Sequence, residues 1–122
     1  MSSDKLEYPV IYLDSSDFDD NGELVNDTLI STHKPVIVLI QSNHCGWCTQ
    51  AKPAYISSAN NNRNIIFSVI DYETDSDAAK KVSKVSECKG FPHYMCYKNG
   101  KFVSDDIKGR DEKNLKEFAS KN

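Results

Sequence analysis

The sequence predicts an α/β fold built around one hydrophobic core. Apolar runs typical of β-strands alternate along the chain with helix-like segments, and the turn-forming residues fall between these segments. The chain has 122 residues, 39% of them hydrophobic and 27% charged, which is the size and composition of one ordinary globular domain. We therefore expect a single domain over residues 1–122, with residues 1–8 as a flexible or loosely attached N-terminus.

The first half of the chain contains two predicted strands. Residues 10–13 form a short apolar segment typical of a first strand. Residues 23–33 are ambiguous, because their apolar spacing is roughly helical but the segment is short and contains weak helix formers. The run Val36–Ile40 is uninterrupted and mostly β-branched, which predicts a central strand buried on both faces.

The second half of the chain predicts a helix, a strand and a second helix. A helix is expected to begin near Cys45 and to reach Ala59 with Pro53 inside it, where the proline removes one hydrogen bond and kinks the helix. The polar residues 60–64 predict a loop, and residues 65–70 predict the next buried strand. One more helix is expected to follow.

The remaining elements complete the order ββαβαββα, with residues 23–33 uncertain. The second helix is capped by Asp75, Ser76 or Asp77 and ends near Lys89-Gly90. Residues 91–97 and 101–107 form a hairpin joined by Asn99-Gly100. Asp111 caps a last helix, whose inward residues are Leu115, Phe118 and Ala119.

Composition and charge exclude several classes of function. The formal net charge is −3 and no basic patch is visible, so we expect no nucleic-acid partner. No apolar run approaches the roughly 20 residues that span a bilayer, and the first eight residues carry charges where a secretory signal would be apolar. We therefore expect a cytoplasmic, reducing location, no membrane partner and a monomer. In that setting, four cysteines indicate redox chemistry or metal binding before structural disulfides.

Cys45 and Cys48 lie where a buried strand meets the start of a helix. The unpaired N–H groups and partial positive charge of a helix N-terminus stabilise a thiolate on Cys45. Cys48 follows one helical turn later and can attack a mixed disulfide formed by Cys45. The same spacing also makes half of a zinc knuckle, and a metal site that includes Cys88 and Cys96 is the explicit alternative.

Several motifs together resemble the thioredoxin family from about Val10 to Ala119. They are the buried strand before the pair, Cys45-x-x-Cys48, Pro53, Gly90-Phe91-Pro92, Tyr97-Lys98-Asn99-Gly100, Gly109 and the last helix. The resemblance implies a thioredoxin fold, with a central mixed β-sheet flanked by helices. It also implies that Pro92 is cis and that Phe91 and Pro92 lie beside the cysteines and bind the substrate backbone.

The sequence departs from the thioredoxin pattern around the cysteines. Gly46-Trp47 replaces the usual glycine-proline and is closer to the glycine-aromatic pairs of some disulfide isomerases, and His44 replaces the usual tryptophan. Leu39 occupies the position of a buried carboxylate, and Phe67 aligns with its lysine neighbour. Since the family's acid moves the proton of the second cysteine, we expect slow resolution or transfer of that task to water, His44 or another group.

The resulting prediction is a thiol-disulfide oxidoreductase that reduces protein disulfides through catalytic Cys45 and Cys48. No bound cofactor or metal is expected, since the redox-active Cys45–Cys48 disulfide stores the electrons, which come from a thioredoxin reductase or another thiol donor. A disulfide isomerase or oxidase, or a binding module with little turnover, is the alternative.

Other residues receive weaker assignments. Trp47 is predicted to contact substrate, and His44, Gly46 and Pro53 to form the active-site environment. The sequence leaves two roles open for His93, that of a surface histidine and that of a catalytic group. Cys88 and Cys96 are expected to be small buried side chains, with Cys88 the better candidate for regulation.

Overall fold

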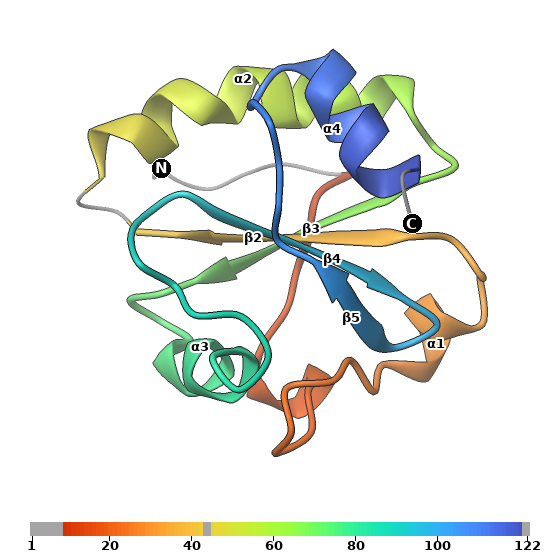
Figure 1. Ribbon diagram of the computed structural model, residues 1–122, viewed down its shortest axis with the longest axis vertical. Helices are drawn as coiled ribbons and strands as arrows, with labels where there is room; N and C mark the ends of the chain where they lie inside the picture. Colours follow the sequence, from red (N-terminus) through yellow and green to blue (C-terminus); the bar gives the residue numbers. More distant parts are fainter. Residues whose placement is uncertain (1–8, 43–44, 121–122) are drawn as a thin grey trace.

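A computed structural model describes residues 9–42 and 45–120, and it contains a five-stranded mixed sheet covered by helices on both faces (Figure 1). The strands are β1 (Ile11–Tyr12), β2 (Val36–Gln41), β3 (Ile66–Asp71), β4 (His93–Lys98) and β5 (Lys101–Ser104), and the helices are η1 (Ser15–Asp17, 3₁₀), α1 (Asp27–Ile30), α2 (Gly46–Asn61), α3 (Ser76–Val82) and α4 (Glu112–Ser120). The predicted central mixed sheet flanked by helices is therefore confirmed.

β2 lies at the centre of the sheet, whose strand order is β1-β3-β2-β4-β5. β3 pairs in parallel with β1 and β2, whereas β4 runs antiparallel to both β2 and β5. All six residues of β2 are buried, as predicted for a strand covered on both faces. Its register places Leu39 between Val69 on β3 and Tyr94 on β4.

The two faces of the sheet bury separate hydrophobic clusters, because successive side chains of a strand point to opposite faces. α2 and α4 cover one face, and α1, α3 and η1 lie on the other (Figure 1). The face under α2 buries Ile37, Leu39, Tyr55, Phe67, Tyr94, Leu115 and Phe118, and the face over α3 buries Leu13, Phe18, Val38, Ile40, Ile70, Met95 and Tyr97.

α2 is longer than the sequence predicts. Asn60 and Asn61 belong to the helix, and Asn62 closes it in a buried position. The Asn62 side-chain amide donates to the Ser58 carbonyl at 2.9 Å and to the Glu112 carboxylate at 3.3 Å. The prediction of a loop from residue 60 is wrong because α4 supplies a partner that makes a polar helix end acceptable.

α3 is shorter than predicted and ends at Val82 instead of near Lys89. The Val82 carbonyl accepts from the N–H groups of Val85 and Ser86, so the chain leaves the helix in tight turns. The Ser86 hydroxyl is drawn into a polar network, where it contacts His93 at 2.7 Å and donates to Asp105 at 2.6 Å. These long-range contacts determine where the helix stops.

Other sequence predictions differ by smaller amounts. The ambiguous segment at residues 23–33 forms only the single turn of α1, and the second hairpin strand ends at Ser104 instead of Ile107. The Asn99-Gly100 turn is as predicted, with φ of 52° and 83°. A Cβ at Gly100 would also lie 2.7 Å from the Leu24 carbonyl oxygen. Glycine is therefore required there by both conformation and space.

α4 begins as the sequence predicts. The N–H of Asn114 donates to the Asp111 carboxylate at 2.9 Å, which is the expected N-terminal cap. The predicted inward residues of this helix are all buried: Leu115, Phe118 and Ala119.

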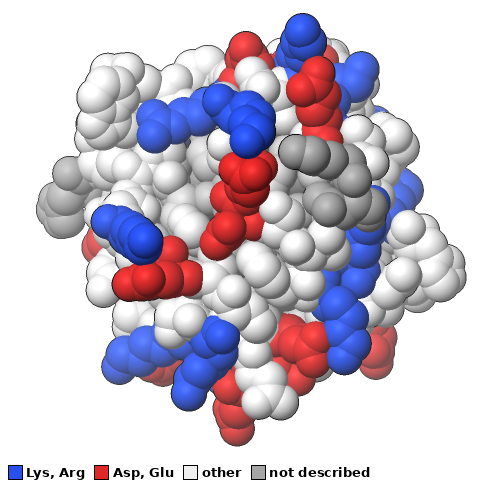
Figure 2. Space-filling view, in the orientation of Figure 1, with Lys and Arg blue, Asp and Glu red and all other residues white. Residues whose placement is uncertain are grey.

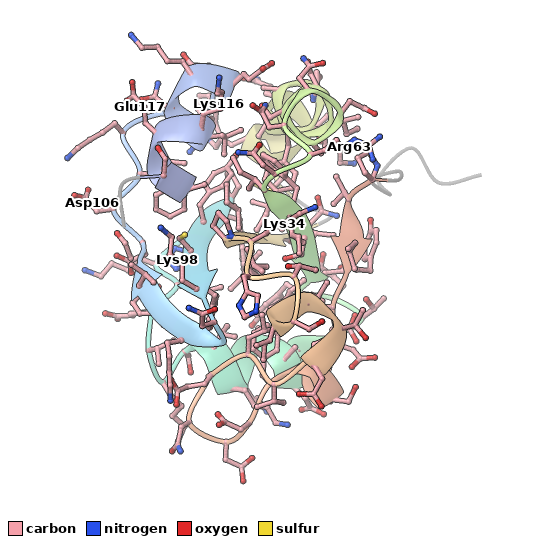
Figure 3. All side chains as sticks on the ribbon, turned by 90° about the vertical axis from the view of Figure 1, so that its right-hand side faces the viewer. Lys34, Arg63, Lys98, Asp106, Lys116 and Glu117 are labelled. Carbon is pink, nitrogen blue, oxygen red and sulfur yellow. The ribbon has the colours of Figure 1, made fainter. Side chains whose placement is uncertain are left out.

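Charged side chains of both signs are interspersed on the face of the molecule shown in Figure 2. Figure 3 shows the end of the sheet away from the start of α2, where the Lys34 ammonium donates to the Arg63 carbonyl at 2.9 Å. Within residues 9–42 and 45–120, no helix has both the length and the apolar character needed to cross a membrane.

Candidate active site

Cys45 is the N-terminal cap of α2. Its backbone is extended, with φ −115° and ψ 112°, and its sulfur accepts a hydrogen bond from the Cys48 N–H at 3.2 Å. The sulfur therefore lies against the unpaired N–H groups of the first turn, where the helix dipole favours negative charge. The predicted helix start at this cysteine is confirmed.

The segment before β4 contacts Cys45, which follows the neighbouring strand β2. The Cys45 thiol donates to the Phe91 carbonyl oxygen at 3.3 Å, and the Phe91–Pro92 peptide bond is cis. The contact joins two segments that are 46 residues apart in the chain. The start of α2 and the end of the α3–β4 loop thus form one site.

Cys48 occupies a more buried environment than Cys45. Its residue is 3% exposed, whereas Cys45 is half-buried. Burial, together with a hydrogen bond to the Cys45 side chain, raises the pKa of the Cys48 thiol to about 12, and the Arg110 charge opposes this rise. The second thiol is therefore protonated at neutral pH and must lose its proton before it can act as a nucleophile.

Trp47 lies at the rim of the site and is 62% exposed. The Arg110 guanidinium lies 5.9 Å from the centroid of its ring, within the range of a cation–π contact. A Cβ added at Gly46 would meet nothing within 4 Å, so the site is open above this residue. Pro53 lies inside α2 and cannot donate to the Thr49 carbonyl.

Tyr72 is a rim residue that the sequence reasoning missed. Its ring lies 5.1 Å from that of Phe91, and 43% of the residue is exposed. Tyr72 directly follows β3, which runs parallel to β2, the strand that leads to Cys45. Since parallel strands end at the same edge of a sheet, its place after a buried strand was the available signal.

The predicted histidines do not extend the site within the described part of the chain. His44 lies outside the described residues. His93 contacts the Ser86 hydroxyl, and burial lowers the pKa of its imidazole although the Asp105 charge opposes this. The geometry thus assigns His93 to the network that ends α3.

The other two cysteines are separate from the pair. Cys96 is fully buried in β4, and burial raises its pKa to about 11, which confirms its prediction as a small buried side chain. Cys88 is half-buried, donates to the Gly90 carbonyl at 3.3 Å, and has a pKa raised by burial. All four cysteines are free, and no group of three metal-ligating side chains occurs in the part of the chain that the structure describes.

Leu39 and Phe67 are buried in the cluster under α2, at 2% and 1% exposure. Tyr94 lies directly opposite Leu39 on β4, and its hydroxyl is buried. Sequence reasoning treated Tyr94 only as part of a strand, because the pairing that brings it opposite Leu39 is a long-range contact.

The two thiols can perform thiol–disulfide exchange. Cys45 is accessible and lies at a helix N-terminus, so it is the natural nucleophile. Cys48 is buried and hydrogen-bonded to Cys45, so it is positioned to close a disulfide with it. The exposed Trp47 and the half-buried Phe91 flank the first thiol and offer apolar surface to a second molecule.

Comparisons with known proteins agree with this chemistry. The thioredoxin family model matches residues 11–121. The chain is similar to the thioredoxin-like protein 453L of Invertebrate iridescent virus 6, with 34% identity over an alignment 132 residues long. The alignment covers 93% of this chain and 94% of that protein. It is also similar to thioredoxin of Geodia cydonium, with 29% identity over 89 residues that cover 73% of this chain and 80% of that one.

Solved structures show the same arrangement of elements. The first thioredoxin domain of mouse protein disulfide-isomerase A4 superposes with a TM-score of 0.71 at 23% identity, covering 96% of this chain and 77% of that chain. Fasciola hepatica thioredoxin gives a TM-score of 0.64 at 24% identity, covering 78% of this chain and 88% of that one. At these identities the likeness concerns the fold.

Proposed function

Because the chain belongs to the thioredoxin family and has its fold, we propose that it reduces disulfide bonds in other proteins through Cys45 and Cys48. Family membership carries the general role of a thiol-disulfide oxidoreductase. The direction of the reaction is our proposal. The exchange chemistry of the pair is supported by one observation above all: the accessible Cys45 thiol caps α2 and accepts a hydrogen bond from the N–H of the buried Cys48 at 3.2 Å.

The reaction has two exchange steps. The Cys45 thiolate attacks one sulfur of the substrate disulfide, so that a Cys45–substrate bond forms while the substrate bond breaks and its leaving thiolate takes up a proton. Cys48 then loses its proton and attacks the sulfur of Cys45, which releases the second substrate thiol. Two electrons pass to the substrate, and a Cys45–Cys48 disulfide remains.

Residues around the pair bind the substrate in this proposal. Trp47 and Phe91 contact the apolar groups that flank the substrate disulfide, and the backbone around Pro92 aligns with its extended chain. Gly46 leaves space above the pair, and Pro53 belongs to the helix that carries both thiols.

The electron supply and the location follow from the same chemistry. A thioredoxin reductase or another thiol donor reopens the Cys45–Cys48 disulfide, so the protein needs no bound cofactor or metal. We place this cycle in the cytoplasm, because a reducing compartment keeps the pair supplied with electrons. We propose that the protein acts as a monomer.

A binding module that keeps its cysteines without turnover is the second candidate. Leu39 favours this second candidate, because it occupies the position of the family's buried carboxylate and cannot assist the buried thiol. A disulfide isomerase or oxidase would use the same two cysteines at a higher reduction potential.

Reduction of insulin by dithiothreitol, with and without the protein, tests the proposal. We expect acceleration by the parent and none by Cys45→Ser. A parent that does not accelerate the reaction would favour the binding module. Equilibration of the parent with glutathione then gives the reduction potential, which separates a reductase from an isomerase or oxidase.

A further inference from the structure

The Tyr94 hydroxyl is a buried polar group that has no hydrogen-bond partner among the described residues. The residue is 3% exposed. A buried hydroxyl without a partner costs free energy, and native structures contain few of them. This hydroxyl is therefore better explained by function than by folding.

The position of Tyr94 links it to the resolving thiol. Tyr94 pairs with Leu39 on the face of the sheet that α2 covers. Its ring lies 6.0 Å from that of Tyr55, which follows Cys48 by two helical turns on α2. The phenol thus lies beneath α2, opposite Leu39 and three residues along the chain from the Phe91 carbonyl that accepts from Cys45.

The charges around the two groups are consistent with this placement. Burial raises the pKa of Tyr94 to about 12, Arg110 lowers it, and Cys48 raises it. The titratable and charged groups that act on Cys48 within the described residues are Cys45 on α2 and Arg110 in the loop before α4, and Tyr94 on β4 responds to Cys48 in turn. None of these groups is a carboxylate.

We propose that the Tyr94 hydroxyl stabilises the thiolate of Cys48 during the resolving step, by donating a hydrogen bond to its sulfur directly or through one water. This inference rests on the proposed function, since it concerns the second exchange step. The neutral phenol, together with the Arg110 charge that acts on both groups, stabilises the thiolate without accepting its proton, which a carboxylate at position 39 would do.

The step balances without a further reactant. The proton of Cys48 passes to solvent, and the phenol keeps its own proton throughout. The Cys48 thiolate forms a bond to the Cys45 sulfur, the bond from Cys45 to the substrate sulfur breaks, and the departing substrate thiolate takes a proton from solvent.

The size of the effect can be estimated. A hydrogen bond to a charged group changes the thiolate population about tenfold, which is roughly one pKa unit. A less acidic thiol is a better nucleophile, which offsets about half of this change on a logarithmic scale. Removal of the hydroxyl should therefore slow resolution about threefold at any pH below the pKa of Cys48.

The test separates the two exchange steps in single-turnover reactions with the disulfide reagent 5,5′-dithiobis(2-nitrobenzoate), in a Cys88→Ser background. Attack by Cys45 releases a first coloured thiolate at a rate that depends on reagent concentration. Attack by Cys48 releases a second one at a rate that does not. Tyr94→Phe is compared with Tyr97→Phe, which removes a hydroxyl from the same strand on the other face.

We expect Tyr94→Phe to leave the first rate unchanged and to slow the second about threefold, with unfolding stability equal to the parent's or higher. Tyr97→Phe should leave both rates unchanged. Incorporation of 3-fluorotyrosine at position 94, a stronger hydrogen-bond donor of similar size, should speed the second step, which a purely structural role would not do.

Two outcomes overturn the inference. If the parent releases the second thiolate normally and Tyr94→Phe matches it, the hydroxyl has no part in resolution while the proposed function survives. If the parent forms the mixed disulfide but never releases the second thiolate, the proposed function fails and this inference fails with it.

Discussion

Each face of the sheet buries one tyrosine from β4, and the two tyrosine hydroxyls differ in their hydrogen bonding. Tyr97, on the face over α3, donates to the Gly22 carbonyl at 2.7 Å. Tyr94, on the face under α2, is also buried, but its hydroxyl has no hydrogen-bond partner among the described residues. The comparison indicates that the face over α3 uses its polar groups for stability, whereas the face under α2 keeps one available beside the cysteine pair.

The largest expected effect separates the two accessible cysteines. Cys45→Ser should lower insulin reduction by more than about 100-fold, because a serine hydroxyl is not ionised at neutral pH. Cys88→Ser should retain nearly all activity, because Cys88 packs against the cluster over α3. Insulin precipitation with dithiothreitol measures both. Equal losses in the two variants would break the assignment of the chemistry to α2.

A carboxylate introduced on each face gives the next largest effect. Leu39→Asp and Val38→Asp should each destabilise the fold by about 3 kcal/mol or more, because both bury an acid. The loss of stability in Leu39→Asp should be about 1–2 kcal/mol smaller, since the Tyr94 hydroxyl opposite can donate to the new carboxylate. Opposite Val38, Met95 has no donor and the Ser68 hydroxyl already donates to the Ile37 carbonyl.

The stability of the Leu39→Asp and Val38→Asp variants should depend on pH. Burial raises the pKa of a carboxyl above its unfolded value of about 3.9, so the folded state holds its proton longer than the unfolded state. Stability should therefore fall as pH rises from about 4 through the raised pKa. Urea unfolding at acidic and alkaline pH measures this, and equal losses for the two variants at every pH would contradict the difference between the faces.

Removal of the two native hydroxyls should have smaller and opposite effects on stability. Tyr97→Phe should cost about 1–3 kcal/mol, because it leaves the Gly22 carbonyl buried without its donor. Tyr94→Phe should be neutral or stabilising, because it removes a buried group that makes no hydrogen bond. Thermal unfolding of both variants is the measurement, and a large loss in Tyr94→Phe would mean that its hydroxyl is structural.

The smallest effect concerns the helix caps. Asp111 accepts from the Asn114 N–H and caps α4, whereas Asp75 at the start of α3 makes no capping bond through its side chain. Asp111→Ala should lower the melting temperature slightly and Asp75→Ala should not. Hydrogen bonds from Asn114 lower the pKa of Asp111, so this contribution is present above the unfolded pKa and is lost as pH falls through the folded one. A difference between the variants that persists in strong acid would contradict this account.

Local signals explain what could be predicted from the sequence. The buried strand followed by Cys45 and Cys48 predicts a thiol at a helix start, and Asp111 predicts the start of α4. Both features can be predicted because the residues that cause them lie within a few positions of one another in the chain. The Asn99-Gly100 turn is local in the same way. These features need no knowledge of the tertiary fold.

The features that could not be predicted depend on distant partners. α2 continues past Ala59 because Glu112 accepts from the amides of Asn61 and Asn62 at its end. α3 stops early because Ser86 bonds with His93 and Asp105. Tyr94 becomes notable only when the antiparallel register places it opposite Leu39. Composition and periodicity carry no information about these pairings.

The exposed indole between the two cysteines makes the site observable by light. Trp47 is the only tryptophan in the chain, so the indole emission of the whole protein arises next to Cys48 and two residues from Cys45. Sulfur groups quench excited indole, and their quenching strength differs between a disulfide and two thiols. The unlabelled protein should therefore report its own redox state by fluorescence, continuously and at micromolar concentration.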